Sequence, residues 1–258
     1  MTLEGKVALV TGGAQGLGKA FSEKLLQNGA KVAIGDLNHK QGEQTIQEFT
    51  SQYGVGKAIF VQCDVTSLDE MTNLFQNAKK ALGCLDIVVN NAGIGGEFAP
   101  MWEKVIDVNI KGVVHGTQLA IEHLRKDKGG NGGHIINIAS AGGLNPNPFS
   151  PIYGATKAAV VHFTRCWAMN PTTIDNGIRL NILCPSFVDT PMTKNISEKV
   201  CHDYETAKAF IEKIGVISPE TVADALMALL KNKEHNGAIL KVSKRGGEEF
   251  CTLQLVPV

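Results

Sequence analysis

The sequence predicts an α/β protein of three layers, a doubly wound parallel sheet of seven strands with helices on both faces. Seven short runs rich in Val and Ile alternate with longer segments of helical periodicity. The runs lack the apolar–polar alternation of a half-exposed strand, which indicates strands that are covered on both faces. No Pro/Ser-rich linker or internal repeat interrupts the chain, so we expect residues 1–258 to form a single domain.

The apolar runs that predict the strands lie at residues 7–10, 32–34, 58–61, 85–89, 134–138, 180–183 and 238–242. Apolar residues three and four positions apart predict helices at residues 18–26, 41–49, 68–82, 105–124, 158–169 and 222–230. Two polar stretches break the pattern, residues 145–148 and 189–206. Both follow carboxyl ends of expected strands, where open α/β sheets bind ligands, so they are candidates for a substrate mouth.

The composition argues against several classes of protein. The chain has 25 Lys+Arg and 25 Asp+Glu, and this balance provides no basic field for nucleic acid or acidic lipid. The six cysteines form no Cys-x-x-Cys pair and have no histidine at ligand spacing, so we expect neither a disulfide framework nor a metal site. We expect no signal peptide or membrane span, and a reducing, cytoplasmic location fits best.

A glycine-rich turn follows the first expected strand and leads into a helix, with the sequence Thr11-Gly12-Gly13-Ala14-Gln15-Gly16-Leu17-Gly18. Glycine lets the backbone approach a pyrophosphate, and the free N–H groups at the helix start attract its charge. Asp36 lies eighteen residues past Gly18, close to the spacing of an acid that binds the adenosine ribose. A carboxylate repels a 2′-phosphate and no arginine flanks Asp36, so NAD is predicted over NADP. The nearby His39 and Lys40 argue in the other direction.

Ser140 stands at the end of the fifth expected strand, and Tyr153 precedes Lys157 by four residues. On a helix this spacing places both side chains on one face. A neighbouring ammonium favours the phenolate, as does a cationic nicotinamide, and lowering a tyrosine pKa from about 10 to near 7 corresponds to about 4 kcal/mol. Tyr153 is therefore a candidate general base near neutral pH.

In their order along the chain these motifs resemble the short-chain dehydrogenase/reductase family, and the resemblance covers essentially the whole sequence. It implies a Rossmann-type sheet with NAD as cofactor, Tyr153 as the base and Ser140 holding the substrate oxygen. It also implies that Lys157 lowers the pKa of Tyr153 and binds the nicotinamide ribose, and that Asn109 holds a water. The matching motifs are Thr11 to Gly18, Asn90-Asn91-Ala92-Gly93, Asn109, Ser140, Tyr153 and Lys157.

The family's cofactor contacts carry over to many positions of this sequence. They include an adenine pocket after the third strand and a nicotinamide side after the sixth. The cofactor residues that the resemblance implies are Gly12, Gln15, Gly16, Leu17, Gly18, Asp36, Leu37, Cys63, Asp64, Val65, Asn91, Ala92, Gly93, Tyr153, Lys157, Phe187, Val188 and Thr190.

Within the family the chain is similar to the NAD-dependent 15-hydroxyprostaglandin dehydrogenase group, at residues 5–12, 62–65, 102–104, 177–181 and 236–239. It departs from that group where Phe149-Ser150 replace two glutamines, Ile214 a tyrosine and Ser186 a glycine. The resemblance implies a homodimer that oxidises an apolar or lipid-like secondary alcohol, and the departures leave the exact alcohol open. The expected substrate residues, in part within a loop at about residues 186–217, are Ser140, Phe149, Ser150, Tyr153, Phe187, Met192 and Ile214.

Two other functions fit the same sequence. The first is a carbonyl reductase acting on a steroid, retinoid or isoprenoid ketone, because sequence does not set the direction of hydride transfer. The second is a catalytically silent dinucleotide-binding sensor or scaffold, because a fold does not establish a function. The presence of Asn109, Ser140, Tyr153 and Lys157 together argues against the silent protein.

Overall fold

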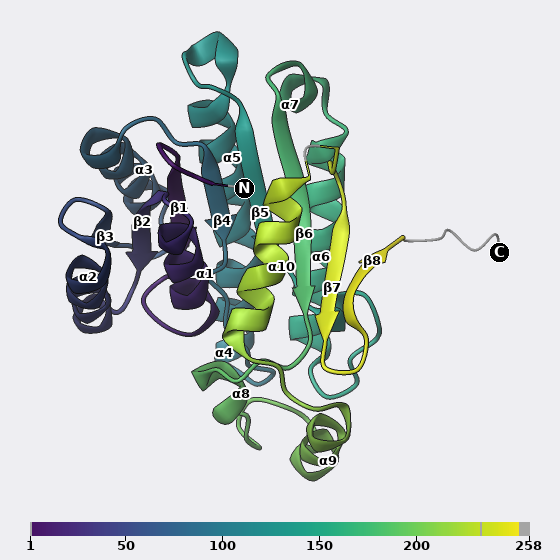
Figure 1. Ribbon diagram of the computed structural model, residues 1–258. Coiled ribbons are helices and arrows are strands. Elements are labelled where there is room, and N and C mark those ends of the chain that lie inside the picture. Colours follow the sequence, from purple (N-terminus) through teal and green to yellow (C-terminus); the bar gives the residue numbers. More distant parts are fainter. Residues whose placement is uncertain (1, 233, 253–258) are drawn as a thin grey trace.

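The fold is built on an eight-stranded sheet with the strand order β3-β2-β1-β4-β5-β6-β7-β8 (Figure 1). The structure is a computed structural model that describes residues 2–232 and 234–252. Neighbouring strands from β3 to β7 pair in parallel, which confirms the doubly wound parallel arrangement. The strands are β1 (Val7–Thr11), β2 (Lys31–Asp36), β3 (Ala58–Gln62), β4 (Ile87–Asn90), β5 (Gly133–Ile138), β6 (Ile178–Pro185), β7 (Ile239–Ser243) and β8 (Gly247–Cys251).

The prediction of seven strands was wrong, because β8 adds an eighth that runs antiparallel to β7. Leu240 pairs with Phe250, and Ser243 pairs with Gly247 beside the turn. Gly247 has a φ of 61°, a left-handed conformation that glycine adopts without strain. The strand was missed because its residues are mostly exposed and contain no apolar run. An antiparallel edge strand on an otherwise parallel sheet is common in doubly wound folds.

Helices cover both faces of the sheet (Figure 1). On β1, Ala8 and Val10 belong to one apolar cluster, whereas Val7 and Leu9 belong to the cluster on the opposite face. This two-sided burial explains the absence of apolar–polar alternation in the strand sequences. The first face carries α1 (Gly16–Gln27), α2 (His39–Tyr53) and α10 (Pro219–Lys231), and the second carries α3 (Leu68–Leu82), α5 (Gly112–Leu124) and α6 (Pro151–Ala168).

The helix expected at residues 105–124 is divided into three parts. It begins earlier, as α4 (Met101–Ile106), passes through the π-helical turn η1 (Asp107–Lys111) and continues as α5. Asn109 lies within the π-helical turn and is fully buried. Single π-helical turns inside α-helices occur frequently at functional sites, so this irregularity draws attention to Asn109.

The segment between β6 and α10 lies below the carboxyl ends of the strands in Figure 1. The sequence identifies it as a polar stretch, and the structure adds the short helix α8 (Pro191–Lys194) and the helix α9 (Tyr204–Ile214). Asp203 caps α9, because its Oδ1 accepts the N–H of Thr206 at 3.3 Å. The remaining short elements are α7 (Pro171–Asp175) and the 3₁₀ turns η2 (Lys126–Lys128) and η3 (Ala141–Gly143).

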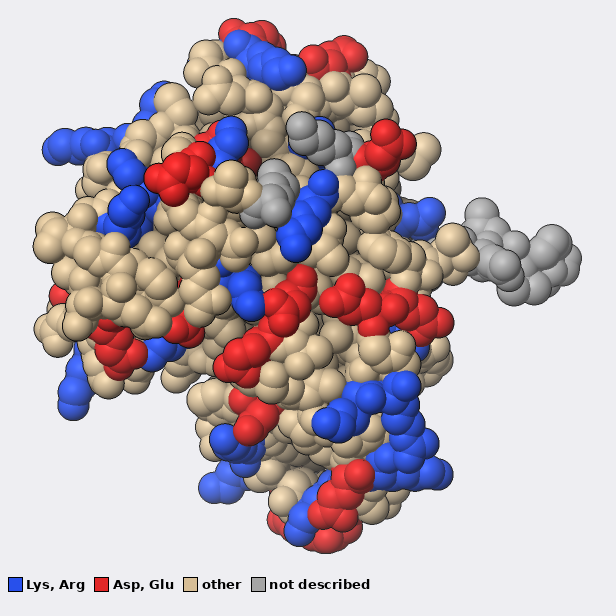
Figure 2. All heavy atoms as spheres, viewed as in Figure 1, with Lys and Arg blue, Asp and Glu red and all other residues tan. Residues whose placement is uncertain are grey.

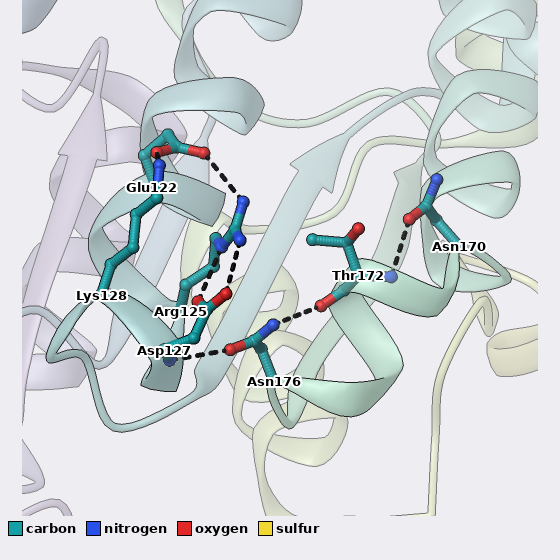
Figure 3. A network of polar contacts seen from close by, with 7 residues as sticks. All are labelled: Glu122, Arg125, Asp127, Lys128, Asn170, Thr172 and Asn176. Atoms are coloured by element: carbon teal, nitrogen blue, oxygen red, sulfur yellow. Dashed lines mark hydrogen bonds and ion pairs between the residues drawn. The ribbon is translucent and has the colours of Figure 1, made fainter.

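A polar network joins the α5–β5 connection to α7 (Figure 3). Arg125 donates to both carboxylate oxygens of Asp127, at 2.8 and 2.6 Å, and to Glu122 at 3.3 Å. Asn176 accepts the N–H of Asp127 at 3.1 Å and donates to the carbonyl of Thr172 at 2.9 Å. These residues precede β5 and β6, so the network closes the end of the sheet opposite the carboxyl ends of the strands.

Basic and acidic side chains are interspersed on the face of the molecule shown in Figure 2. This mixture agrees with the equal numbers of Lys+Arg and Asp+Glu in the sequence. Within residues 2–232 and 234–252, no helix has the length and apolar character needed to cross a membrane.

Candidate functional site

The glycine-rich turn between β1 and α1 forms a backbone cradle. Gly12 and Gly16 have φ angles of 62° and 55°, which favour glycine. A Cβ at Gly18 would lie 2.0 Å from the carbonyl oxygen of Gly12, so a larger residue would force the helix away from the strand. α1 starts without a side-chain cap from Gln15 and without an acidic residue in its first turn. Its first N–H groups and positive end therefore fit the pyrophosphate of a dinucleotide.

Asp36 lies beside this turn, at the end of β2. Its Oδ2 accepts the N–H of Ala14 at 3.0 Å, and its Oδ1 accepts the N–H of Asn38 at 3.0 Å. Each carboxylate oxygen retains acceptor capacity for a ribose hydroxyl. The imidazole of His39 is directed to Glu43, with 4.0 Å between Nε2 and Oε1. The geometry therefore fits the ribose contact that the sequence predicts for Asp36.

The segment after β3 lies next to Asp36, because the N–H of Cys63 donates to the Asp36 carbonyl at 3.0 Å. Cys63 and Val65 are buried, and Asp64 accepts the N–H and the hydroxyl of Thr66 at 2.9 and 2.8 Å. Burial raises the pKa of the Cys63 thiol to about 12, with a further contribution from the nearby Glu70. Cys63 is thus a neutral, buried residue next to Asp36.

Asn91 ties the segment after β4 to the glycine-rich turn. Its Nδ2 donates to the carbonyls of Thr11 and Gly12 at 2.9 and 3.1 Å. The hydroxyl oxygen of Thr11 in turn accepts the N–H groups of Asn91 and Ala92 at 3.1 and 3.2 Å. Asn91 therefore supports the cradle through its side chain, and its expected place near the adenosine ribose stays a prediction.

The structure brings the catalytic candidates together at the carboxyl ends of β4 and β5. The Ser140 hydroxyl oxygen accepts the N–H of Gly142 at 3.1 Å, and the hydroxyl lies close enough to the phenol of Tyr153 to oppose the rise of its pKa. Nζ of Lys157 lies 5.7 Å from the centroid of the Tyr153 ring. A Cβ at Gly93 would lie 3.2 Å from Lys157 Nζ and 3.3 Å from Asn109 Oδ1, so the glycine lies against both groups.

Asn109 uses both ends of its side-chain amide within the protein. Its Oδ1 accepts the N–H of Ile94 at 2.9 Å, and its Nδ2 donates to the carbonyl of Ile94 at 3.0 Å and to Thr156 Oγ1 at 3.1 Å. These bonds link the loop after β4 to α6. The water expected near Asn109 stays a prediction.

Burial shifts the pKa of both Tyr153 and Lys157. Burial raises the pKa of Tyr153, and the hydrogen bond from Ser140 opposes this rise. Burial also lowers the pKa of Lys157 to about 8. In these low-dielectric surroundings both charged forms are disfavoured, and the lowering of the Tyr153 pKa by Lys157 stays a prediction. A positive charge entering the cleft would lower the pKa of the phenol.

The segment after β6 folds back over the glycine-rich turn. A Cβ at Gly16 would lie 3.5 Å from Thr190, which is itself buried. The carbonyl of Phe187 accepts the N–H of Ile217 at 3.0 Å, and Val188 is buried. The Ser186 hydroxyl is buried and has no hydrogen-bond partner among the described residues. This segment thus lies beside the glycine-rich turn, and its contact with the nicotinamide stays a prediction.

Three phenylalanine rings connect the expected substrate residues. The ring centroid of Phe210 on α9 lies 5.6 Å from that of Phe149 and 6.3 Å from that of Phe187. Phe210 is 42% exposed and was missed in the sequence, although it precedes Ile214 by one helical turn. Met192 on α8 is 45% exposed, and the Ser150 hydroxyl makes no cap hydrogen bond to α6.

A second missed residue, Glu97, lies in the loop between β4 and α4 and is buried. Its carboxylate accepts the N–H groups of Ile152 and Tyr153 at 2.9 and 3.0 Å. Glycine turns and Tyr-x-x-x-Lys spacing are local signals, but the contact between Glu97 and α6 joins residues 55 and 56 positions apart. Nothing in the local sequence marks this acid as buried.

The six cysteines are free. Within the described part of the chain, no group of three or more His, Cys, Asp or Glu side chains is arranged to hold a metal ion. The site therefore consists of a dinucleotide cradle and a hydroxyl–phenol–ammonium cluster.

The sheet order, the glycine-rich turn and the Ser140–Tyr153–Lys157 cluster define a Rossmann-type short-chain dehydrogenase. In agreement, residues 6–200 match the family described as short chain dehydrogenase, and the chain belongs to this family. The resemblance to which the sequence motifs point is therefore confirmed.

Individual relatives are similar along 90% or more of the chain. The 15-hydroxyprostaglandin dehydrogenase (NAD(+)) of Mus musculus is 40% identical over 263 residues, which cover 100% of this chain and 97% of the relative. The protein of the same name from Homo sapiens is 38% identical over 262 residues, covering 100% and 98%. The 3-oxoacyl-(acyl-carrier-protein) reductase of Thermotoga maritima is 34% identical over 239 residues, covering 90% and 93%.

Proposed function

We propose that this protein is an NAD-dependent oxidoreductase that oxidises a secondary alcohol of an apolar or lipid-like substrate to the ketone. The observation that carries the proposal is the meeting of Ser140, Tyr153 and Lys157 at the carboxyl ends of the central strands. The printed names of the mammalian relatives, which are NAD(+) dehydrogenases of a hydroxyprostaglandin, support the reaction class and the cofactor.

The residues of the cradle fit NAD. The N–H groups at the start of α1 would bind the pyrophosphate, and Asp36 would accept hydrogen bonds from the adenosine ribose. Leu37, Cys63, Asp64 and Val65 would surround the adenine side. Lys157 would donate to the nicotinamide ribose, and Phe187, Val188 and Thr190 would cover the nicotinamide. NAD⁺ supplies the acceptor for the hydride that leaves the carbinol carbon.

Tyr153 would remove the proton of the substrate hydroxyl, acting as the general base. The Ser140 hydroxyl would hold the substrate oxygen by a hydrogen bond while negative charge develops on it. The Lys157 ammonium would stabilise the phenolate of Tyr153 by its positive charge. Asn109 would keep the loop after β4 in contact with α6 through Thr156.

The proposed substrate wall is apolar. Phe149, Phe187 and Phe210 bring three aromatic rings together, and Met192 and Ile214 add aliphatic surface in the same segment. Mainly apolar walls with few polar anchors are typical of sites for lipid-like ligands. Because Phe149-Ser150 stand where related dehydrogenases carry two glutamines, the substrate would be anchored more by apolar contact than by side-chain amides.

A second candidate is the reverse reaction, reduction of a steroid, retinoid or isoprenoid ketone. The same residue could serve it, because a protonated tyrosine can donate a proton to a carbonyl oxygen. The printed name of the Thermotoga maritima relative, a reductase, supports the same direction.

The test is an assay of NADH absorbance with the purified full chain. Secondary alcohols of increasing apolar length are offered with NAD⁺ or NADP⁺, and the corresponding ketones are offered with NADH or NADPH. NADH formation from the apolar alcohols is the expected result. Efficient ketone reduction without alcohol oxidation would favour the reductase, and coenzyme binding without turnover in either direction would favour the silent sensor.

We further propose that the protein works as a homodimer in the cytoplasm. The free cysteines support a reducing compartment. On α6 the partly exposed rings of Phe163 and Trp167 lie one helical turn apart, which supports assembly through α5 and α6. Sedimentation of the purified protein tests the stoichiometry, and a monomer at all concentrations would contradict it.

A further inference from the structure

A buried acid outside the proposed catalytic group contacts the helix that carries Tyr153. Glu97 is 5% exposed, and its Oε2 and Oε1 accept the N–H groups of Ile152 and Tyr153 at 2.9 and 3.0 Å. Among residues 2–232 and 234–252, no Lys or Arg forms an ion pair with it. Because burial of a carboxylate is costly unless it is paired or hydrogen-bonded, the helix N–H groups stabilise Glu97 in this place.

The first turn of α6 needs this contact because it has no local cap. Ser150 occupies the position before the helix, yet its side chain makes no cap hydrogen bond, and Pro151 has no N–H. The next two N–H groups belong to Ile152 and Tyr153 and would otherwise lack partners. By contrast, α3 and α10 are capped by the residues that precede them, Ser67 and Ser218. At α6 the cap comes from a distant loop.

The same loop is held to α6 by a second route. The Tyr153 carbonyl accepts the Thr156 hydroxyl at 2.7 Å, and Thr156 Oγ1 accepts Asn109 Nδ2 at 3.1 Å. Asn109 pairs with both backbone polar groups of Ile94, three residues before Glu97. The hydrogen bonds therefore form a closed circuit through the loop and the helix. Within it, both the N–H and the carbonyl of Tyr153 have fixed partners.

We propose that Glu97 is a positioning residue for the oxidoreductase reaction. Its carboxylate fixes the backbone of Tyr153 in the first turn of α6, so that the phenol ring keeps its place beside Lys157. Glu97 acts through Tyr153 and is not assigned a contact with substrate or cofactor. The inference rests on the proposed function, because it assigns the proton transfer to Tyr153.

Two variants test the proposal. Glu97→Gln keeps the side-chain length but only one acceptor oxygen, whereas Glu97→Ala removes both acceptors. We expect kcat to fall about 10-fold and about 100-fold respectively, because a displacement of about 1 Å at a reacting group costs about 10²-fold. KM and the NAD⁺ dissociation constant should change less than about two-fold, since ground-state contacts remain. Glu103→Gln, an exposed change on α4, is the matched control and should leave kcat unchanged.

Amide hydrogen exchange provides a readout that does not depend on turnover. Both Glu97 variants should speed exchange at Ile152 and Tyr153 and leave the later turns of α6 protected, whereas Glu103→Gln should change neither. Unchanged exchange at Ile152 and Tyr153, or an unchanged kcat in a Glu97 variant, would overturn the proposal. If the wild type oxidises no secondary alcohol, the proposed function fails, and the exchange measurement still decides whether Glu97 holds the first turn.

Discussion

Nζ of Lys157 lies 5.7 Å from the centroid of the Tyr153 ring. The ammonium donates to the carbonyl of Ile138 at 2.9 Å and is 3% exposed as a residue. The two groups are thus close to one another. Burial raises the pKa of Tyr153 and lowers that of Lys157, so it favours the neutral form of each. The chemistry proposed for this pair depends on the positive charge that a bound nicotinamide adds.

The phenol oxygen is the first group to test. Tyr153→Phe should reduce kcat to less than about a tenth of the wild-type value, because general base catalysis contributes about 10² to 10⁴ in rate. Binding of NAD⁺, measured by calorimetry, should stay nearly unchanged. Tyr53→Phe is a matched control, because that phenol lies on α2 and contacts Glu23 at 3.3 Å. Retention of more than about a tenth of the activity in Tyr153→Phe would contradict the assignment of the base.

Removal of the buried ammonium should make stability depend less on pH. The pKa of Lys157 is about 8 in the folded protein against 10.5 ordinarily, so the unfolded chain binds more protons between these values. The free energy of unfolding of the wild type therefore rises with pH across this window, by up to about 3 kcal/mol. The nearby Cys184 does not interfere, because burial raises its pKa to about 12.

Lys157→Met should accordingly be more stable than the wild type at pH 7, with a difference that shrinks as the pH approaches 10. Urea unfolding at several pH values measures this, and Lys199→Met, at an exposed position, should show no such dependence. A difference between Lys157→Met and the wild type that is independent of pH would contradict the role of burial in lowering this pKa.

Asp36 should decide the choice of coenzyme. Asp36→Ala removes the acceptor for the ribose hydroxyls and the charge that repels a 2′-phosphate, so the ratio of kcat/KM with NADP⁺ to that with NAD⁺ should rise by about 10-fold or more. Asp175→Ala changes an exposed acid at the end of α7 and should leave the ratio unaltered. An unchanged ratio in Asp36→Ala would mean that another group selects the coenzyme.

Phe210 should contribute to the apolar substrate wall. Phe210→Ala removes a ring that contacts Phe149 and Phe187, so KM for long apolar alcohols should rise by about 10-fold, at about 1–3 kcal/mol of lost burial. The change for the shortest alcohols should be small. Phe250→Ala, on the outer strand, serves as the control because this ring is half exposed and packs on His235. Equal effects on short and long alcohols would argue against a wall role.

The parts of the site that the sequence predicted depend on local spacing. The glycine-rich turn and the Tyr153–Lys157 pair each lie within a few positions, and residues 68–82 form the expected helix with the expected bounds. Phe210 and Glu97 were missed because their roles depend on contacts with residues far away in the sequence. In the sequence, Phe210 on a mostly polar helix and Glu97 in a loop resemble solvent-exposed residues. The fold places Phe210 against Phe149 and Glu97 at the start of α6.

The pKa of Tyr153 depends on more than the local spacing of its neighbours. The spacing of Tyr153 and Lys157 indicates that they are neighbours, but sequence alone does not measure how far water is excluded from them. Burial is the largest contribution to the Tyr153 pKa and raises it, so a further positive charge in the cleft would be needed to lower it.

The outermost strand β8 has a consequence for solubility. It covers β7, whose Leu240 and Val242 are buried and whose free edge would otherwise offer unpaired amides and carbonyls to other chains. Glu248 and Glu249 place acidic charge on the new edge, and Glu249 forms an ion pair with Lys241 at 3.0 Å. Acidic side chains on a short, exposed edge strand disfavour edge-to-edge aggregation of sheets. A truncation before Gly247 would therefore expose the unpaired edge of β7 to other chains.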